Sequence, residues 1–331
     1  MYDHYIALDW AQSNMAIARM TKKSGDIKSM DVPSDLGNLK DYLRNLKGSK
    51  ILTFEETTTA QWLYTELNPL VDKLCICDPY RNKLLSEGAK TDLIDASKLV
   101  QLLRADLLKP VFHSNDKLIE IRKLISSYDD LVQRGVRLKN QRSALFRAKG
   151  LDKKEKELNG LHEVFILSKI DSAIAEYESD KNEYLKQFES ISKSHKVIRH
   201  LQGIPGVGLI GAIKIAGILI TAKRFESNKH FLSYCGLVRL QKLSGGKNYG
   251  WKVPRHRRDL KTVFKTAALS CITHENEFKD YYEYLIREQN YPTYQARHAV
   301  ARKIAIAAKG VMNSKGKFKS EKIGALREIK K

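Results

Sequence analysis

The sequence predicts an α/β domain at the N-terminus, followed by a helical middle and a mostly helical C-terminal part. Three observations support this fold class. The first hundred residues alternate short apolar runs with turn residues, residues 114–198 keep a helical period among many charges, and the remainder combines apolar helices with glycine-rich turns. A chain of 331 residues, of which 42% are hydrophobic, can bury cores in two or three domains.

Five strands are expected in the first domain. Residues 5–10 and 14–20 are apolar runs separated by polar residues, which suits an antiparallel pair, and a third run follows a Gly-Asp turn. Two later runs are separated by segments of helical periodicity. The expected strands are 5–10, 14–20, 27–32, 51–56 and 73–78. The expected helices are one capped by Ser34 and ended by Gly48, one at about 59–67, one from about 80, and one from Asp92 to about 106.

The expected order of elements is RNase H-like: three strands, a helix, a strand, a helix, a strand and then further helices. In such a sheet Asp9 would lie on the central strand and Glu55 or Glu56 at the end of its neighbour, with Asp92 and Asp95 on the last helix. These acids would converge at one end of the sheet. A cluster of buried carboxylates repels itself unless cations neutralise it, and two Mg²⁺ ions about 4 Å apart would do so.

A simpler interpretation of Asp92 and Asp95 is helix capping, because an acid in a first turn satisfies free N–H groups and complements the helix dipole. Capping does not account for Asp9, which interrupts the apolar run IALDW. A buried charge must be paired or bound to metal. The metal interpretation therefore explains more of the sequence than capping does.

The formal net charge of +21 indicates a polyanionic partner, and nucleic acid is the commonest one. An anionic membrane is the alternative, but the most apolar run, Leu209–Ile220, is 12 residues long and contains Lys214, so it is too short to span one. No signal peptide is visible, and the four cysteines have neither zinc-ligand spacing nor the pattern of a disulfide framework. A soluble, intracellular protein is expected.

The middle of the chain, residues 113–197, contains two long amphipathic helical patterns joined around residues 150–160. They suit an antiparallel pair or a coiled coil used for dimerisation, and a plain helical spacer is the alternative. Residues 201–216, LQGIPGVGLIGAIKIA, then resemble a helix-hairpin-helix motif, in which Gly206 and Gly208 would expose backbone N–H groups to a phosphate. The alternative is a glycine turn that only lets two helices pack closely.

Residues 239–261 are strongly basic and contain the sequence SGGK. Gly245 and Gly246 would let backbone N–H groups approach a phosphate, and Ser244 would supply a hydroxyl that could act as a nucleophile. An ordinary flexible turn is the alternative, and no general base is identifiable nearby. Tyr249 and Trp251 could stack on bases or anchor the loop. The expected nucleic-acid-binding residues are Lys242, Gly245, Gly246, Lys247, Arg255, Arg257, Arg258, Gly206 and Gly208.

Together these motifs resemble the DEDD transposases of bridge-RNA-guided insertion sequences, which are relatives of the Piv DNA-inverting recombinases. The resemblance extends over nearly the whole chain and rests on the order of its motifs. These are IALDW, FEETT, DPYRNK, KTDLIDA, RLKNQ, IPGVG, SYCGLV and LSGGK. Glu56 stands where that family usually has a small residue, so Glu55 is favoured as the acid and Glu56 is its rival.

The resemblance implies three parts: an RNase H-like (RuvC-like) domain over residues 1–112, a helical coiled-coil region over 113–197, and a transposase domain over 198–331. It implies that Asp9, Glu55, Asp92 and Asp95 bind Mg²⁺, with Mn²⁺ as a substitute, and that Ser244 attacks a DNA phosphate. Implied partners are target DNA, donor DNA, a structured noncoding guide RNA and further copies of the chain, as a dimer or tetramer, with no membrane.

The expected function is therefore that of a transposase or site-specific recombinase in a prokaryotic cytoplasm, associated with the nucleoid. Three alternatives remain at this point. The first is a metal-dependent junction nuclease without a covalent intermediate. The second is a DNA-inverting recombinase with the same chemistry, and the third is a non-catalytic nucleic-acid-binding protein.

Overall fold

The computed structural model describes residues 1–80, 91–152 and 158–319. These divide into two compact units, residues 1–115 and residues 116–331. The helix expected from about residue 80 falls mostly outside the described residues, as do the end of the DPYRNK motif and Lys90 of KTDLIDA. The finer division of the second unit at about residue 198 stays a prediction.

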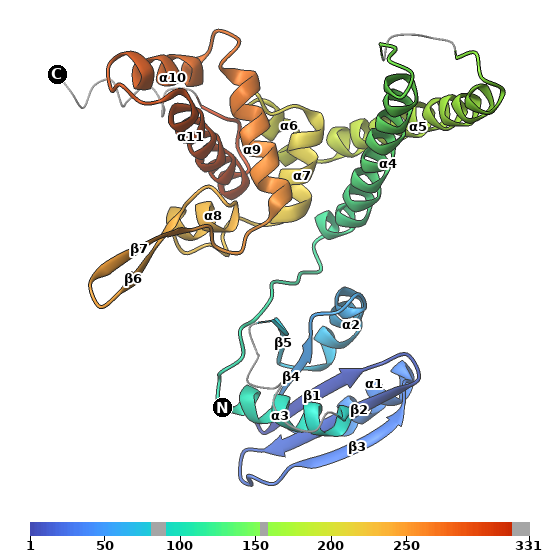
Figure 1. Cartoon of the computed structure of the whole chain (residues 1–331). Coiled ribbons are helices and arrows are strands. Elements are labelled where there is room, and N and C mark those ends of the chain that lie inside the picture. The colour runs from blue at the N-terminus through green and yellow to red at the C-terminus, as the bar shows by residue number, and fades with distance from the viewer. Residues whose placement is uncertain (81–90, 153–157, 320–331) are drawn as a thin grey trace. The chain divides into compact units, whose positions relative to one another are not determined.

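The first unit is an α/β fold built on a mixed five-stranded sheet of order β3-β2-β1-β4-β5 (Figure 1). Strand β1 pairs antiparallel with β2 and parallel with β4, so it is central, as expected. The elements are β1 (His4–Trp10), β2 (Asn14–Thr21), β3 (Lys28–Pro33), α1 (Leu36–Asn45), β4 (Lys50–Glu55), α2 (Ala60–Leu67), the 3₁₀ turn η1 (Asn68–Leu70), β5 (Lys73–Cys77) and α3 (Asp92–Arg104). The five predicted strands are confirmed to within two residues at each end.

Alternating side chains of the sheet form two separate cores. Ile6 and Leu8 of β1 pack with α1 and α2 on one face, whereas Tyr5 and Ala7 pack with α3 on the other. This alternation is the period-2 pattern of a sheet covered on both faces. One cap differs from the prediction: Asp35, and not Ser34, accepts the N–H of Asn38 at the start of α1. The hydroxyl of Ser34 instead donates to the carbonyl of Ala11.

The described part of the second unit is helical apart from one β-hairpin. Its elements are the 3₁₀ turn η3 (Lys117–Ile119), α4 (Ile121–Arg147), α5 (Leu161–Ser194), α6 (Lys196–Gln202), α7 (Leu209–Leu219), α8 (Asn228–Tyr234), β6 (Leu240–Ser244), β7 (Lys247–Lys252), α9 (Arg258–Cys271), α10 (Glu277–Arg287) and α11 (Thr293–Ser314). Large side chains such as Phe231, Phe264 and Ile304 are fully buried among these helices. None of the helices in the described ranges has the length and apolar character that a membrane span requires.

Helices α4 and α5 form the antiparallel pair that the periodicity predicts. Ion pairs join positions that rise along α4 to positions that fall along α5, namely Arg134–Glu176, Arg142–Asp171 and Lys149–Glu163. These cations therefore face carboxylates on the neighbouring helix. Because Arg134–Glu176 and Lys149–Glu163 are largely exposed, solvent screening leaves them little effect on stability.

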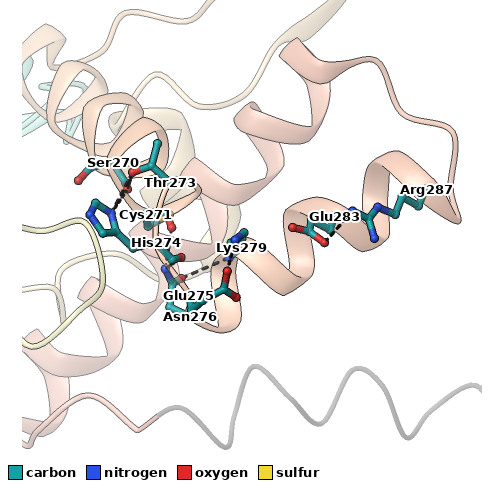
Figure 2. A network of polar contacts seen from close by, with 9 residues as sticks. All are labelled: Ser270, Cys271, Thr273, His274, Glu275, Asn276, Lys279, Glu283 and Arg287. Carbon is teal, nitrogen blue, oxygen red and sulfur yellow. Dashed lines mark hydrogen bonds and ion pairs between the residues drawn. The ribbon is translucent and has the colours of Figure 1, made fainter.

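The turn between α9 and α10 is closed by polar contacts (Figure 2). The side-chain oxygen of Asn276 accepts the N–H groups of Phe278 and Lys279, and its amide nitrogen donates to the carbonyls of Cys271 and His274. One residue thus caps the start of α10 and satisfies carbonyls at the end of α9. Ion pairs Lys279–Glu275 and Arg287–Glu283 lie along the same segment. This network fixes where α10 begins. A structural role therefore accounts for the polar side chains gathered in this turn.

Candidate active site

Asp9 and Glu55 lie at the ends of the two central parallel strands and point to the same face of the sheet. Leu8 of β1 is in register with Phe54 of β4, so Asp9 and Glu55 are the next residues on each strand. Leu8 and Phe54 belong to the core under α1 and α2. Because side chains alternate along a strand, Asp9 and Glu55 face the opposite side, which α3 covers.

Helix α3 brings Asp92 and Asp95 to this end of the sheet in its first turn. The N-cap is Thr91, whose hydroxyl accepts the N–H of Ile94 at 3.3 Å. Asp92 therefore does not cap the helix, and the capping interpretation is wrong for this residue. Both still lie at the positive end of the helix dipole, which favours carboxylates there.

The four acids of the predicted tetrad interact electrostatically. Burial raises the pKa of Asp9, and the nearby charges of Asp92 and Asp95 raise it further. Burial likewise raises the pKa of Glu55, followed by the charges of Asp9, Asp95 and Asp78. The structure thus gathers Asp9, Glu55, Asp92 and Asp95 from three separated elements into one negatively charged site.

Asp78 is a fifth acid near this site that the sequence interpretation missed. It follows β5 directly, one residue beyond Cys77, which is in register with Glu55. Its carboxylate accepts the N–H of Tyr80, and its charge contributes to the raised pKa of Glu55. The signal was present in the sequence, because an acid at the carboxyl end of a strand beside β4 falls at the same edge of the sheet as Glu55.

Glu56, the rival of Glu55, has a different environment. Its Oε2 lies 2.5 Å from Nε2 of His113, and Nδ1 of the same ring lies 2.8 Å from Oε1 of Gln61. The His113 side chain is only 5% exposed, whereas that of Glu56 is 39% exposed. Glu56 is thus engaged with His113, which in turn contacts Gln61 of α2, and Glu55 is the residue that shares the acidic site.

No three Asp, Glu, His or Cys side chains in the described ranges lie close enough to hold a metal ion in their present positions. The donor set nevertheless fits a divalent cation, because carboxylate oxygens are the ligands that Mg²⁺ and Mn²⁺ prefer. A cation would also stabilise the charged forms of Asp9 and Glu55, which burial and then the neighbouring carboxylates disfavour. Asp92 is exposed, so a rotamer change could bring its carboxylate to such an ion.

Ser244 ends β6 at the tip of a hairpin that extends from the helices of the second unit (Figure 1). It pairs with Lys247 across the two-residue turn Gly245-Gly246. Both glycines have positive φ, 54° and 76°, which is the geometry of a type I′ hairpin turn. Ser244 and Lys242 are exposed, and the Ser244 hydroxyl makes no hydrogen bond to a described residue. The hydroxyl is therefore accessible to a substrate phosphate.

The remaining predicted contact residues fall into two groups. Lys242 and Lys247 lie on the hairpin, and Arg255, Arg257 and Arg258 follow it, all with exposed side chains. Arg257 pairs with Asp259 at 3.0 Å. In the segment before α7, a Cβ on Gly206 would lie 2.2 Å from the Ala267 carbonyl oxygen, whereas a Cβ on Gly208 would meet nothing within 4 Å. Close packing thus explains Gly206, and only Gly208 is open at a helix N-terminus.

Comparison with known families gives two matches: one covers most of the first unit and continues through α4, and the other lies within the second unit. Residues 6–148 match the DEDD transposase model of IS110, described as a transposase. Residues 198–283 match a second model, described as the transposase IS116/IS110/IS902 family. A search of curated proteins found no match. The first match spans the four clustered acids, and the second spans the Ser244 hairpin.

Proposed function

Because the chain belongs to the IS110 family of DEDD transposases, which are enzymes that cut and rejoin DNA, we propose that it recombines DNA through a Ser244–phosphate intermediate assisted by Mg²⁺ at Asp9, Glu55, Asp92 and Asp95. The observation that carries this proposal is the convergence of four acids from β1, β4 and α3, two of which have raised pKa values in the absence of a cation. Such a constellation is costly for folding and useful for holding a cation.

In the proposed reaction the Ser244 Oγ attacks a backbone phosphorus of DNA. An Oγ–P bond forms, the bond from phosphorus to one deoxyribose oxygen breaks, and the hydroxyl proton passes to solvent or to the leaving oxygen. The reverse attack by a deoxyribose hydroxyl of another strand restores the serine and joins the strands without ATP. When bound, the metal would stabilise the negative charge on the reacting phosphate oxygens.

The hairpin supports the nucleophile part of the proposal by its accessibility. Lys242 and Lys247 lie on the same hairpin as Ser244, and the two glycines carry no side chain that would keep a phosphate away. The positive charge of the hairpin attracts the DNA backbone, which carries no sequence information itself. We propose that a structured RNA, by pairing with target and donor DNA, supplies the sequence selection.

Recombination must hold two duplexes, so we propose that the enzyme acts as a dimer or tetramer. In this arrangement the acidic site of one protomer and the Ser244 hairpin of another would act on the same phosphate. Mixing an Asp9→Asn protein with a Ser244→Ala protein tests this directly. Recovery of activity in the mixture supports shared sites, and two inactive proteins that stay inactive when mixed contradict them.

The deciding experiment is a search for a denaturant-resistant protein–DNA adduct. Purified protein, Mg²⁺, the RNA transcribed from its element and labelled target and donor DNA are incubated with wild type, Ser244→Ala and Asp9→Asn. A matched control is Ser168→Ala, which removes an exposed hydroxyl on α5 whose one partner among the described residues is the Phe165 carbonyl. We expect the adduct with wild type and Ser168→Ala only. Cleavage without an adduct, undiminished in Ser244→Ala, would identify a metal-dependent nuclease instead.

A further inference from the structure

A second feature of the C-terminal unit is an open cleft of about 780 Å³ beside the base of the hairpin. Its walls come from the segment after α8, from β7, and from helices α9 and α11. Its volume falls in the range of sites that bind nucleotide-sized molecules. Ser244 does not line it, so it is distinct from the serine turn.

The cleft is strongly basic. Five Lys and Arg residues line it, and no Asp or Glu is among the described lining residues. Within the described part of the chain, no carboxylate forms an ion pair with Lys261, Lys265 or Arg302. Cations gathered without counterions in one concavity repel one another and focus a positive field there. An anionic ligand would remove that repulsion.

The pKa of His298 is sensitive to the cations that surround it in the cleft. It is half-buried on the wall that α11 forms. Burial lowers its pKa, and the charges of Arg302, Lys265 and Lys261 lower it further, in that order. The three cations, which come from α9 and α11, therefore act on one point inside the cleft.

Aromatic rings line the same cleft with their surfaces exposed. Trp251 is 58% exposed, Tyr294 is 65% exposed and Tyr291 is 41% exposed. Rings of this size are usually buried, so three exposed ones on one concavity indicate a ligand with a flat apolar face. Nucleic-acid bases have such a face, and stacking on a protein ring is available to them only when they are unstacked from their neighbours. Duplex DNA would meet the cations but not the rings.

We propose that this cleft binds an unpaired stretch of nucleic acid, with phosphate groups on Lys261, Lys265 and Arg302 and bases stacked on Trp251 and Tyr294. The proposal rests on the enzyme handling nucleic acid, but not on Ser244 being the nucleophile. The cleft would hold a short unpaired segment of a single strand. The strand could come from the guide RNA or from DNA opened during recombination, and the test has an arm for each source.

The test measures binding by the full chain carrying Ser244→Ala, in EDTA and without Mg²⁺, so that neither serine-dependent nor metal-dependent cleavage interferes. Fluorescent single-stranded DNA, single-stranded RNA and duplex DNA of equal length are titrated against this protein and against the same protein with Tyr294→Ala. Stacking on one ring is worth about 1–3 kcal/mol, so Tyr294→Ala should weaken single-strand binding roughly 5- to 160-fold and leave duplex binding within about 2-fold. The single strand that loses more affinity identifies the source.

Two controls keep the result interpretable. Phe165→Ala removes a ring of similar exposure, 62%, on α5 outside the cleft and should leave all affinities unchanged. Lys265→Gln should reduce the steepness of log affinity against log salt by about 1 for the single strand, because one phosphate contact is lost. Lys186→Gln, on α5 outside the cleft, should leave this steepness unchanged. The proposal is overturned if Tyr294→Ala leaves single-strand binding unchanged, or weakens duplex binding equally.

Discussion

Glu56 and His113 are joined at 2.5 Å between Oε2 and Nε2, although 57 residues separate them in the chain. The contact holds the segment before the second unit against the end of β4. It also separates the roles of two adjacent acids, because Glu55 shares its surroundings with Asp9, Asp95 and Asp78 instead. The choice between Glu55 and Glu56, which the sequence left to family resemblance, thus acquires a physical basis.

The first prediction concerns this pair of acids. Glu55→Gln should abolish strand cleavage, because it removes a charge from the proposed metal site. Glu56→Gln should keep measurable cleavage but lower the free energy of unfolding by about 1 kcal/mol, since it weakens a charge-assisted hydrogen bond to a buried ring. Cleavage assays and urea unfolding of both variants distinguish the two effects. Equal loss of cleavage in both variants would contradict the assignment.

The second prediction concerns the repulsion within the acidic site. Asp9→Asn should raise the melting temperature of the metal-free protein by about 1–2 °C, because a half-buried carboxylate near other acids is removed and solvent already screens part of the repulsion. Mg²⁺ should raise the melting temperature of wild type but not of Asp9→Asn. Thermal unfolding with and without Mg²⁺ measures both. Asp31→Asn, at an exposed position of β3, is the control and should change neither value.

The third prediction separates packing from phosphate binding in the IPGVG segment. Gly206→Ala should cost about 2 kcal/mol or more, because φ is +81° and the new Cβ would lie 2.2 Å from the Ala267 carbonyl oxygen. Gly208→Ala has open space and should cost at most about 1 kcal/mol, the effect of a poorer N-cap. If Gly208→Ala weakens DNA binding at unchanged stability, a phosphate role for that N-terminus is supported. Equal destabilisation by the two variants would contradict the packing argument.

The fourth prediction is a pH dependence that originates at His298. Burial and the charges of Arg302, Lys265 and Lys261 lower its folded-state pKa below the usual 6.5. The unfolded chain therefore binds a proton more readily, so the associated stability is present above pH 6.5 and is lost as the pH falls below it. Urea unfolding between pH 7.5 and 5 should show a smaller loss for His298→Gln than for wild type. An identical loss in both would rule out His298 as the source.

The strands of the first unit could be predicted because their apolar runs are short, alternate correctly and end at turn residues. The helix caps could not, because neighbouring residues of similar chemistry compete for the same N–H groups. Asp35 caps α1 instead of Ser34, and Thr91 caps α3 instead of Asp92. Sequence spacing does not show which of two adjacent side chains has the required backbone angle.

The hairpin strands and the cleft were not predicted, for different reasons. LQKLS and KNYGWK lack a buried face, so the alternation that marks a strand is absent. The cleft combines Trp251 with Tyr294 and Arg302, which lie on segments far apart in the chain, and no local motif connects them. Tertiary packing alone creates such a site, whereas the acids at strand ends follow from the strand order itself.

The Gly245-Gly246 turn constrains the number of residues in the hairpin more than it constrains which residues stand on its strands. The strands that it joins expose nearly all their side chains, so burial does not fix their pairing and the turn geometry must do so. A shift of one residue would rotate Ser244 to the opposite face of the ribbon. Single-residue insertions or deletions between the register shift at Gln241/Leu243 and Lys247 should therefore abolish DNA cleavage. Substitutions of the exposed strand residues, by contrast, should mostly be tolerated. The number of residues in the hairpin therefore sets the face of the ribbon on which the Ser244 hydroxyl lies.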